Sequence, residues 1–368
     1  MTRPTRIRAF SRPYAPFHDV YQRYYQEGLR AHAAATSARF ELEALSPLPG
    51  LLRRLRTVRD RNFAGRLHVP RANAIFDAVG HRLEGPLLTP SGLFEPTVGQ
   101  YLLTYADGSE RRLCIDASDP PEIANDELRA WCDVYLKTNY WGERSYPQNV
   151  RPMVNGDPLM LGRLDELKRR RSAPKTVDLS FVVRIWGGGD GVAGIEHNVR
   201  LLEAVNRARC DKRLLAIVLA GDVEQTLRHL RRIGVPATTR GISPRELWDL
   251  TAASRLNVFR LGLHYCVPWR MTGSLAVGSC IVLDRPPLSR WPEPLREGVN
   301  FLSLGALVAP DAPVAADAQY DEIPERIEEW LGRPEPLAEI GKANGSYFDG
   351  FLAPEQVGRQ VVEAAEPL

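Results

Sequence analysis

Residues 239–284, TRGISPRELWDLTAASRLNVFRLGLHYCVPWRMTGSLAVGSCIVLD, decide the fold of this chain. RELWDLTAAS has apolar residues at helical spacing after a Ser-Pro start, and NVFRLG and CIVLD are short β-rich runs closed by turn residues. Two strands joined through a helix form the unit of a parallel α/β sheet, whose ligands bind at the carboxyl ends of the strands. We therefore expect the polar loop 264–272 to lie at a ligand site.

The alternation of strand and helix continues on both sides of this stretch. Upstream of it the pattern predicts strand 177–185, helix 195–209, strand 213–220, helix 222–233 and a short strand near 235–239. Such alternation predicts a parallel, doubly wound sheet with right-handed crossovers. Nearer the amino terminus the pattern predicts strand 5–10, helix 18–35, strand 40–45, strand 74–79, a hairpin around Ala-Asp-Gly-Ser at 106–109 and helix 125–132.

A chain of 368 residues exceeds one typical core, so we expect two domains. The first is predicted to span 1–160 and the second 176–345. The polar segment 161–175, with its Ser-Ala-Pro break, is predicted to link them. Residues 346–368 are expected to end in a helix.

The order of these signals resembles the nucleotide-sugar half of glycosyltransferases with two Rossmann-like domains, the GT-B architecture. The spacing RMTGSLAVGSCIVLD is most similar to the exostosin-like and spore-maturation-type branches. A second resemblance lies in 133–156, where D-V-Y-x-K-x-x-Y precedes N-V-x-P-x-x-x-G, and a third in Glu297-Gly298-Val299-Asn300-Phe301. The matching residues of the opening stretch are Gly241, Ser243, Glu246, Leu247, Ala252, Ala253, Arg270, Leu275, Ala276, Gly278, Val282 and Asp284.

The resemblance implies two Rossmann-like domains that face each other across a cleft, with the carboxy-terminal helix crossing back to the first domain. It implies transfer of a sugar from a UDP- or GDP-linked donor to an acceptor hydroxyl held mainly by the amino-terminal domain. Many retaining members place glutamates where this chain has Tyr265 and Gly273. Their absence favours an inverting enzyme.

Donor-binding residues are expected around the second sheet. WGGGDGVAG, 186–194, follows a strand and precedes a helix, so its glycines would let backbone N–H groups approach a diphosphate. Arginines can hold diphosphate oxygens in a bidentate manner. The predicted donor-binding residues are Arg184, Gly188, Gly189, His197, Asn198, Arg240, Gly241, Arg260, His264, Arg270, Thr272 and Glu297.

An inverting reaction needs a general base near the acceptor hydroxyl. By resemblance in position, His18 is the predicted base, oriented by Asp116 or Asp119, although His18 and Asp19 could instead cap the helix that follows. Tyr14, Lys137 and Asn139 are predicted to line the acceptor side. Because no D-x-D triplet stands in a suitable loop, we expect arginines and glycine-loop amides to stabilise the leaving diphosphate, with no metal and no cofactor.

Composition limits the other possibilities. The formal charge is only +3, so no global polyanion-binding field is expected, and five scattered cysteines predict reduced thiols in a cytosolic protein without a zinc site. The dominance of Arg with abundant Ala and Pro is typical of a GC-rich bacterial source. No apolar run predicts export or a membrane span. No stable protein partner is implied.

Two alternatives remain open. The glycine loop Gly189-x-Gly191-x-x-Gly194, with Asp222 near the next strand, also resembles a dinucleotide fingerprint, which would make the chain an NAD(P)-dependent oxidoreductase. The second alternative is nucleic-acid or membrane binding by the basic cluster within 51–66, whose ordinary explanation is a solvated helix face. A transferase could also use this cluster to dock an anionic acceptor, such as DNA or a lipid-linked sugar, at the inner membrane face. The cluster comprises Arg53, Arg54, Arg56, Arg59, Arg61 and Arg66.

Overall fold

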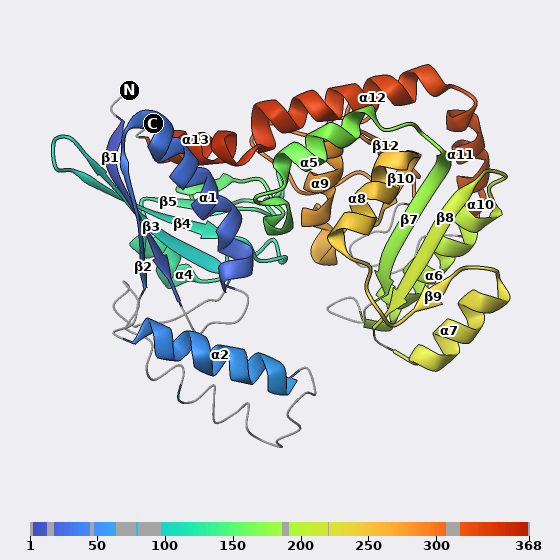
Figure 1. The fold of residues 1–368 in the computed structure, drawn as a ribbon, viewed down its shortest axis with the longest axis horizontal. Coiled ribbons are helices and arrows are strands. Elements are labelled where there is room, and N and C mark those ends of the chain that lie inside the picture. Colours follow the sequence, from blue (N-terminus) through green and yellow to red (C-terminus); the bar gives the residue numbers. More distant parts are fainter. Residues whose placement is uncertain are drawn as a thin grey trace. The chain divides into compact units, whose positions relative to one another are not determined.

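The computed structural model describes residues 3–12, 18–44, 48–63, 79, 97–185, 191–219, 221–306 and 317–366. The chain divides into two compact units, one formed by Met1–Val154 with Ala353–Leu368 and the other by Asn155–Leu352. Among the described residues each unit contains one six-stranded sheet with helices, which confirms the predicted α/β class (Figure 1).

The second unit has a wholly parallel sheet in the order β12-β11-β10-β7-β8-β9. Read from its other edge, this is the 3-2-1-4-5-6 order of a doubly wound fold, and the order reverses between β7 and β10. The strands are β7 (Val177–Ile185), β8 (Lys212–Val218), β9 (Ala237–Thr238), β10 (Ser254–Phe259), β11 (Cys280–Leu283) and β12 (Phe301–Ser303). The helices are α5 (Leu164–Arg169), α6 (Gly191–Arg207), α7 (Val223–Arg232), α8 (Pro244–Ala253), α9 (Trp269–Val277), α10 (Asp317–Asp321), α11 (Ile323–Leu331) and α12 (Pro334–Tyr347).

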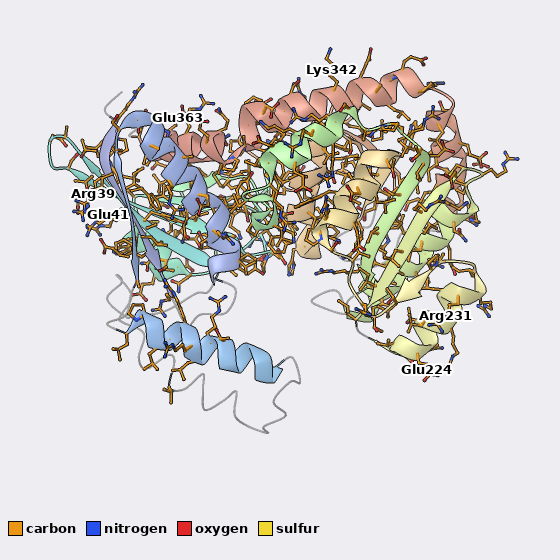
Figure 2. All side chains as sticks on the ribbon, in the orientation of Figure 1. Arg39, Glu41, Glu224, Arg231, Lys342 and Glu363 are labelled. Carbon is orange, nitrogen blue, oxygen red and sulfur yellow. The ribbon has the colours of Figure 1, made fainter. Side chains whose placement is uncertain are left out.

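Apolar residues on both faces of the central strands explain this sheet, because a parallel sheet is covered by helices on both sides. Phe181 of β7 and Leu256 of β10 are fully buried, in one core with Leu201 of α6 and Ile327 of α11. On the surface, α7 exposes Glu224 and Arg231 (Figure 2).

Helix α8 begins as the Ser-Pro signal predicts. The Ser243 hydroxyl accepts the Glu246 N–H at 3.2 Å, while the Ser243 N–H donates to the Glu246 carboxylate at 2.8 Å. This capping box satisfies two backbone donors that a helix start leaves free. It fixes where helix α8 begins in the connection between β9 and β10.

The first unit has a mixed sheet in the order β2-β1-β3-β4-β5-β6. Strand β3 runs antiparallel to both β1 and β4, and the other pairings are parallel. The unit therefore departs from an all-parallel Rossmann sheet at its centre. The strands are β1 (Pro4–Ser11), β2 (Arg39–Ala44), β3 (Val98–Tyr105), β4 (Glu110–Asp116), β5 (Val134–Lys137) and β6 (Val150–Pro152), and the helices are α1 (His18–Thr36), α2 (Pro49–Phe63), α4 (Asp126–Trp131) and α13 (Pro354–Ala364).

The predicted hairpin at Asp107-Gly108 accounts for the antiparallel pairing of β3 with β4. Gly108 has φ 82°, and Asp107 accepts both the N–H and the hydroxyl of Ser109, so the chain turns back within a few residues. The edge strand β2 carries Arg39 and Glu41, which pair at 2.5 Å (Figure 2). The predicted strand 74–79 lies outside the described residues except for Val79.

Helix α13 returns to the first unit and lies against α1 (Figure 1). Glycines make this contact possible, because a Cβ at Gly358 would collide with the Gly28 carbonyl, and a Cβ at Gly28 would collide with the Pro354 carbonyl. Among the described helices, none is long and apolar enough to cross a membrane.

Candidate functional site

Three arginines stand at the carboxyl edge of the second sheet, where the strand order reverses. Arg184 is the exposed, next-to-last residue of β7, Arg260 directly follows β10, and Arg270 lies in the first turn of α9. We call these residues the switch-point arginines. Ligands of doubly wound sheets bind in the crevice at this position. The sheet therefore offers guanidinium groups where a ligand is expected.

The environment of Arg270 shows an excess of positive charge here. Burial and the nearby Arg184 cation lower the pKa of Arg270 to about 10, and Asp157 offsets this only in part. Burial raises the pKa of Asp157 to about 6 against the opposing effects of the Leu159 N–H and Arg270. An anion beside Arg184 and Arg270 would offset the repulsion that disfavours the charged form of Arg270.

The loop after β10, residues 260–268, is held in a fixed shape. The Leu261 N–H donates to the Asp284 carboxylate at 3.0 Å, and the Gly262 N–H donates to the Cys266 carbonyl at 2.8 Å. A Cβ at Gly262 would lie 2.5 Å from the Cys266 sulfur, so the turn requires glycine. We call this segment the ligand loop.

Two consecutive residues of the ligand loop have left-handed backbone conformations. His264 has φ 52° and Tyr265 has φ 56°. Such values are uncommon for residues other than glycine, and they are found at sites where the surrounding structure imposes them. His264, a predicted donor-binding residue, therefore has an unusual backbone conformation.

Asn155 joins the ligand loop to helix α9. Its amide donates to the Val267 carbonyl at 3.1 Å, and its own carbonyl accepts the Thr272 hydroxyl at 2.7 Å. Thr272 is fully buried. Its hydroxyl is engaged inside the unit and helps to hold the loop, and its predicted contact with the donor stays a prediction.

His197, also predicted to bind the donor, is buried and engaged on both sides of its ring. Nδ1 lies 2.6 Å from the Tyr320 hydroxyl and Nε2 lies 3.0 Å from the Asp284 carboxylate. The neighbouring Asn198 is fully buried, and its amide donates to the Gly194 carbonyl at 2.7 Å. Both side chains are buried in the second unit, and their contact with a donor stays a prediction.

Asp284 is the centre of this buried network. Burial alone would raise its pKa, but Arg285 together with hydrogen bonds from His197 and the Leu261 N–H outweighs burial and holds the pKa below its usual value. Because Asp284 bonds to residues after β10, after β11 and on α6, it fixes three elements of the edge at once.

Arg285 is a residue of this edge that the sequence analysis did not select. Its Nε donates to Asp284 at 3.2 Å, Nη2 lies 3.1 Å from the same carboxylate, and its guanidinium lies 4.5 Å from the centre of the Tyr265 ring. Its position directly after Asp284, which follows β11, was a signal that could have identified it. The sequence analysis did not select Asn155 or Asp157 either, although Asn155-Gly156 lies at the end of the second stretch of resemblance.

The other predicted donor-binding residues are less enclosed or not described. Arg240, Gly241 and Glu297 are exposed, and the Arg240 N–H donates to the Thr238 hydroxyl at 3.0 Å. Gly188 and Gly189 lie outside the described residues. No role for these five residues follows from the structure.

In the first unit, the predicted catalytic Asp116 is fully buried and occupied. It accepts the Ser118 N–H at 2.9 Å and the Tyr135 hydroxyl at 2.8 Å, and it lies 3.3 Å from the Lys137 ammonium. Lys137 also donates to the Ser118 carbonyl and hydroxyl. Both charges are engaged in the interior of the first unit. That Asp116 orients a base and that Lys137 binds the acceptor stay predictions.

The side chain of Asn139 is also hydrogen-bonded within the first unit. Its amide donates to the Asp119 carbonyl, and its side-chain oxygen accepts from the Trp141 indole at 3.2 Å. Asp119 itself is half-buried. Tyr14 lies outside the described residues, and His18 begins α1 while its side chain is outside them.

The basic cluster forms helix α2 up to Phe63. Arg53 and Arg54 are exposed, Leu52 is fully buried and Leu51 is exposed. The described side chains of this helix therefore fit the ordinary explanation, in which the basic cluster is a solvated helix face.

Among the described residues, no group of three or more His, Cys, Asp or Glu side chains is placed to hold a metal ion.

No family model and no curated protein sequence matches this chain. Solved structures do. The Anabaena protein HepE, in complex with UDP and glucose, is similar at 11% identity and a TM-score of 0.46, covering 99% of this chain and 100% of that one. A glycosyltransferase from Rickettsia africae matches at 10% identity and a TM-score of 0.46 over 98% of both chains, and the lipopolysaccharide outer core galactosyltransferase WaaB matches at 9% identity and a TM-score of 0.40 over 98% of this chain and 99% of its own. Likeness of this degree assigns no substrate and no residue role.

Proposed function

We propose that the chain is a glycosyltransferase that moves a sugar from a UDP- or GDP-linked donor to an acceptor hydroxyl. One observation carries this proposal: Arg184 and Arg270 stand at the switch point of a 3-2-1-4-5-6 sheet, where burial and the Arg184 cation lower the pKa of Arg270. A diphosphate at this point would compensate both charges, and guanidinium groups bind its oxygens well.

The leaving diphosphate gains charge as the bond to the sugar breaks. Preorganised guanidinium groups stabilise such developing charge. We therefore propose transfer without a divalent metal ion, with inversion at the anomeric carbon. His18 remains the proposed base, and Asp116 or Asp119 is proposed to orient it. The engagement of Asp116 with Tyr135 and Lys137 favours Asp119.

The same strand order also suits a dinucleotide, so an NAD(P)-dependent oxidoreductase is the second candidate. The acid expected to hold its ribose is Asp222. This residue caps α7, where its carboxylate accepts the Gln225 N–H at 2.9 Å. Because the Asp222 carboxylate already caps α7, the nucleotide-sugar proposal is favoured.

Thermal stabilisation by UDP-sugars, GDP-sugars, NAD and NADP separates the two candidates, because a ligand that binds the native state raises the melting temperature. We expect one nucleotide-sugar class to stabilise the protein and to be hydrolysed slowly, with the same rate in excess EDTA. Stabilisation by NAD or NADP alone would overturn the proposal. Loss of hydrolysis in EDTA would overturn only its metal-independent part.

A further inference from the structure

One guanidinium nitrogen of Arg285 has no hydrogen-bond partner in the part of the chain that the structure describes. The side chain is 7% exposed, and among the described residues Nη1 has no hydrogen-bond acceptor, whereas Nε and Nη2 both reach Asp284. Leaving a buried charged donor unsatisfied costs on the order of 1–3 kcal/mol. Native structures rarely leave such a donor without a ligand, ion or water that explains it.

The surroundings do not neutralise this guanidinium fully. Asp284 is its only carboxylate contact in the described part of the chain, and that carboxylate also accepts from His197 and the Leu261 N–H. Tyr265 covers the guanidinium through its ring, which binds a cation without accepting an in-plane N–H bond. The in-plane direction of Nη1 is therefore left for an acceptor.

Arg285 also belongs to the edge at which a ligand is expected. It follows β11, the strand next to β10, and its carboxylate partner anchors Leu261, the second residue of the ligand loop after β10. Tyr265, which covers it, lies in the same loop and in a left-handed conformation. A ligand that contacts the loop would lie beside Arg285.

We infer that Nη1 of Arg285 binds an oxygen of the donor's diphosphate, with Tyr265 stacked on the guanidinium to hold it in place. This inference rests on the proposed function. A phosphate oxygen fits because it is anionic and because a guanidinium already fixed by Asp284 presents its remaining N–H in one direction. Asp284 thus acts as a positioning residue for Arg285.

The test is calorimetric binding of UDP, GDP and the corresponding nucleosides to wild type, Arg285→Met, Arg285→Lys and a control. Arg290→Met is a matched control, because it removes the same charge from an exposed residue of the same segment. We expect Arg285→Met to weaken binding of the preferred nucleoside diphosphate about tenfold or more, and nucleoside binding by less than about twofold. Arg290→Met should change neither.

Arg285→Lys keeps a cation beside Asp284, so it retains the fold if Arg285→Met does not, and it should still bind the diphosphate several-fold more weakly because it loses the planar fork. Wild-type affinity for the diphosphate in either folded Arg285 variant would overturn the inference alone. Equal losses of nucleoside and diphosphate affinity would also overturn it, because they would indicate a structural role. If wild type binds neither UDP nor GDP, the proposed function fails as well.

Discussion

The Nε2 atom of His197 lies 3.0 Å from the Asp284 carboxylate, and both side chains are buried. The other ring nitrogen lies 2.6 Å from the Tyr320 hydroxyl. An imidazole that donates from Nε2 and accepts at Nδ1 satisfies all three groups. Helix α6 is thereby joined to the end of β11 and to α10, and the edge that carries the proposed site gains a rigid support.

Replacing Asp284 with Asn should destabilise the protein by about 3 kcal/mol at neutral pH, because it leaves Arg285 buried without its counter-ion. The folded-state pKa of Asp284 lies below its usual value, so its stabilisation is complete above about pH 4 and declines as the pH falls further. Urea unfolding of both proteins across this range measures the difference. A constant difference down to pH 2 would contradict the assignment.

His229 supplies the control for this network. Its Nε2 lies 2.6 Å from Glu203, but both side chains are about one-third exposed. Solvent screens such a pair, so His229→Ala should cost less than about 1 kcal/mol. A cost as large as that of Asp284→Asn would show that burial does not distinguish the two pairs.

The contribution of Asp157 to stability should depend on pH in the opposite direction to that of Asp284. Its pKa is about 6 in the folded protein against about 4 in the unfolded chain, so the folded state binds the proton more tightly between these values. Stability then falls by up to about 3 kcal/mol as the pH rises from 4 to 7, and Asp157→Asn should remove this fall. Chemical denaturation of wild type and variant at several pH values tests it, and parallel curves would refute it.

The second sheet was predictable because its signals are local. Strand β7 spans the predicted 177–185, and α8 begins at the predicted Ser-Pro. Helix α12 was missed, since Gly341 and Gly345 oppose helix formation. Tertiary contact requires a glycine at 341, because a Cβ there would lie 2.6 Å from the Gly278 carbonyl. Sequence patterns do not record such contacts.

The candidate site was predictable only in part, for a related reason. The switch-point arginines follow from strand order, but whether a polar side chain faces a ligand or the interior depends on neighbours far along the chain. His197 meets Asp284 and Tyr320, and Lys137 meets Asp116 and Ser118. The hairpin at Gly108 was predicted, yet it did not indicate that β3 would run antiparallel to β1 as well.

Lys137→Met should destabilise the first unit by about 3–5 kcal/mol, because Asp116 would keep a buried charge without its cation. The double variant Asp116→Asn, Lys137→Met should recover part of this loss, since it removes both charges. Thermal and urea unfolding of the single and double variants measure the coupling. Unchanged unfolding of the Lys137 variant would contradict a structural role for the buried pair and favour the predicted role of Lys137 in binding the acceptor.

Gly358→Ala should cost about 3 kcal/mol, although alanine normally favours a helix, because the new methyl group would collide with the Gly28 carbonyl. Hydrogen exchange should show faster exchange in α13 and α1. Gly350→Ala is the control, as its Cβ would meet nothing within 4 Å. Equal stability of the two variants would contradict the close packing of α13 on α1.

Arg184→Met should separate stability from ligand binding. Removing this exposed cation relieves the repulsion that lowers the pKa of Arg270, so we expect unfolding free energy to stay equal or rise by less than about 1 kcal/mol. Affinity for the preferred nucleoside diphosphate should fall about tenfold, because one charge-assisted contact is lost. Arg231→Met, on the exposed surface of α7, should change neither quantity (Figure 2). A folded Arg184 variant with undiminished affinity would place the diphosphate elsewhere than the switch point.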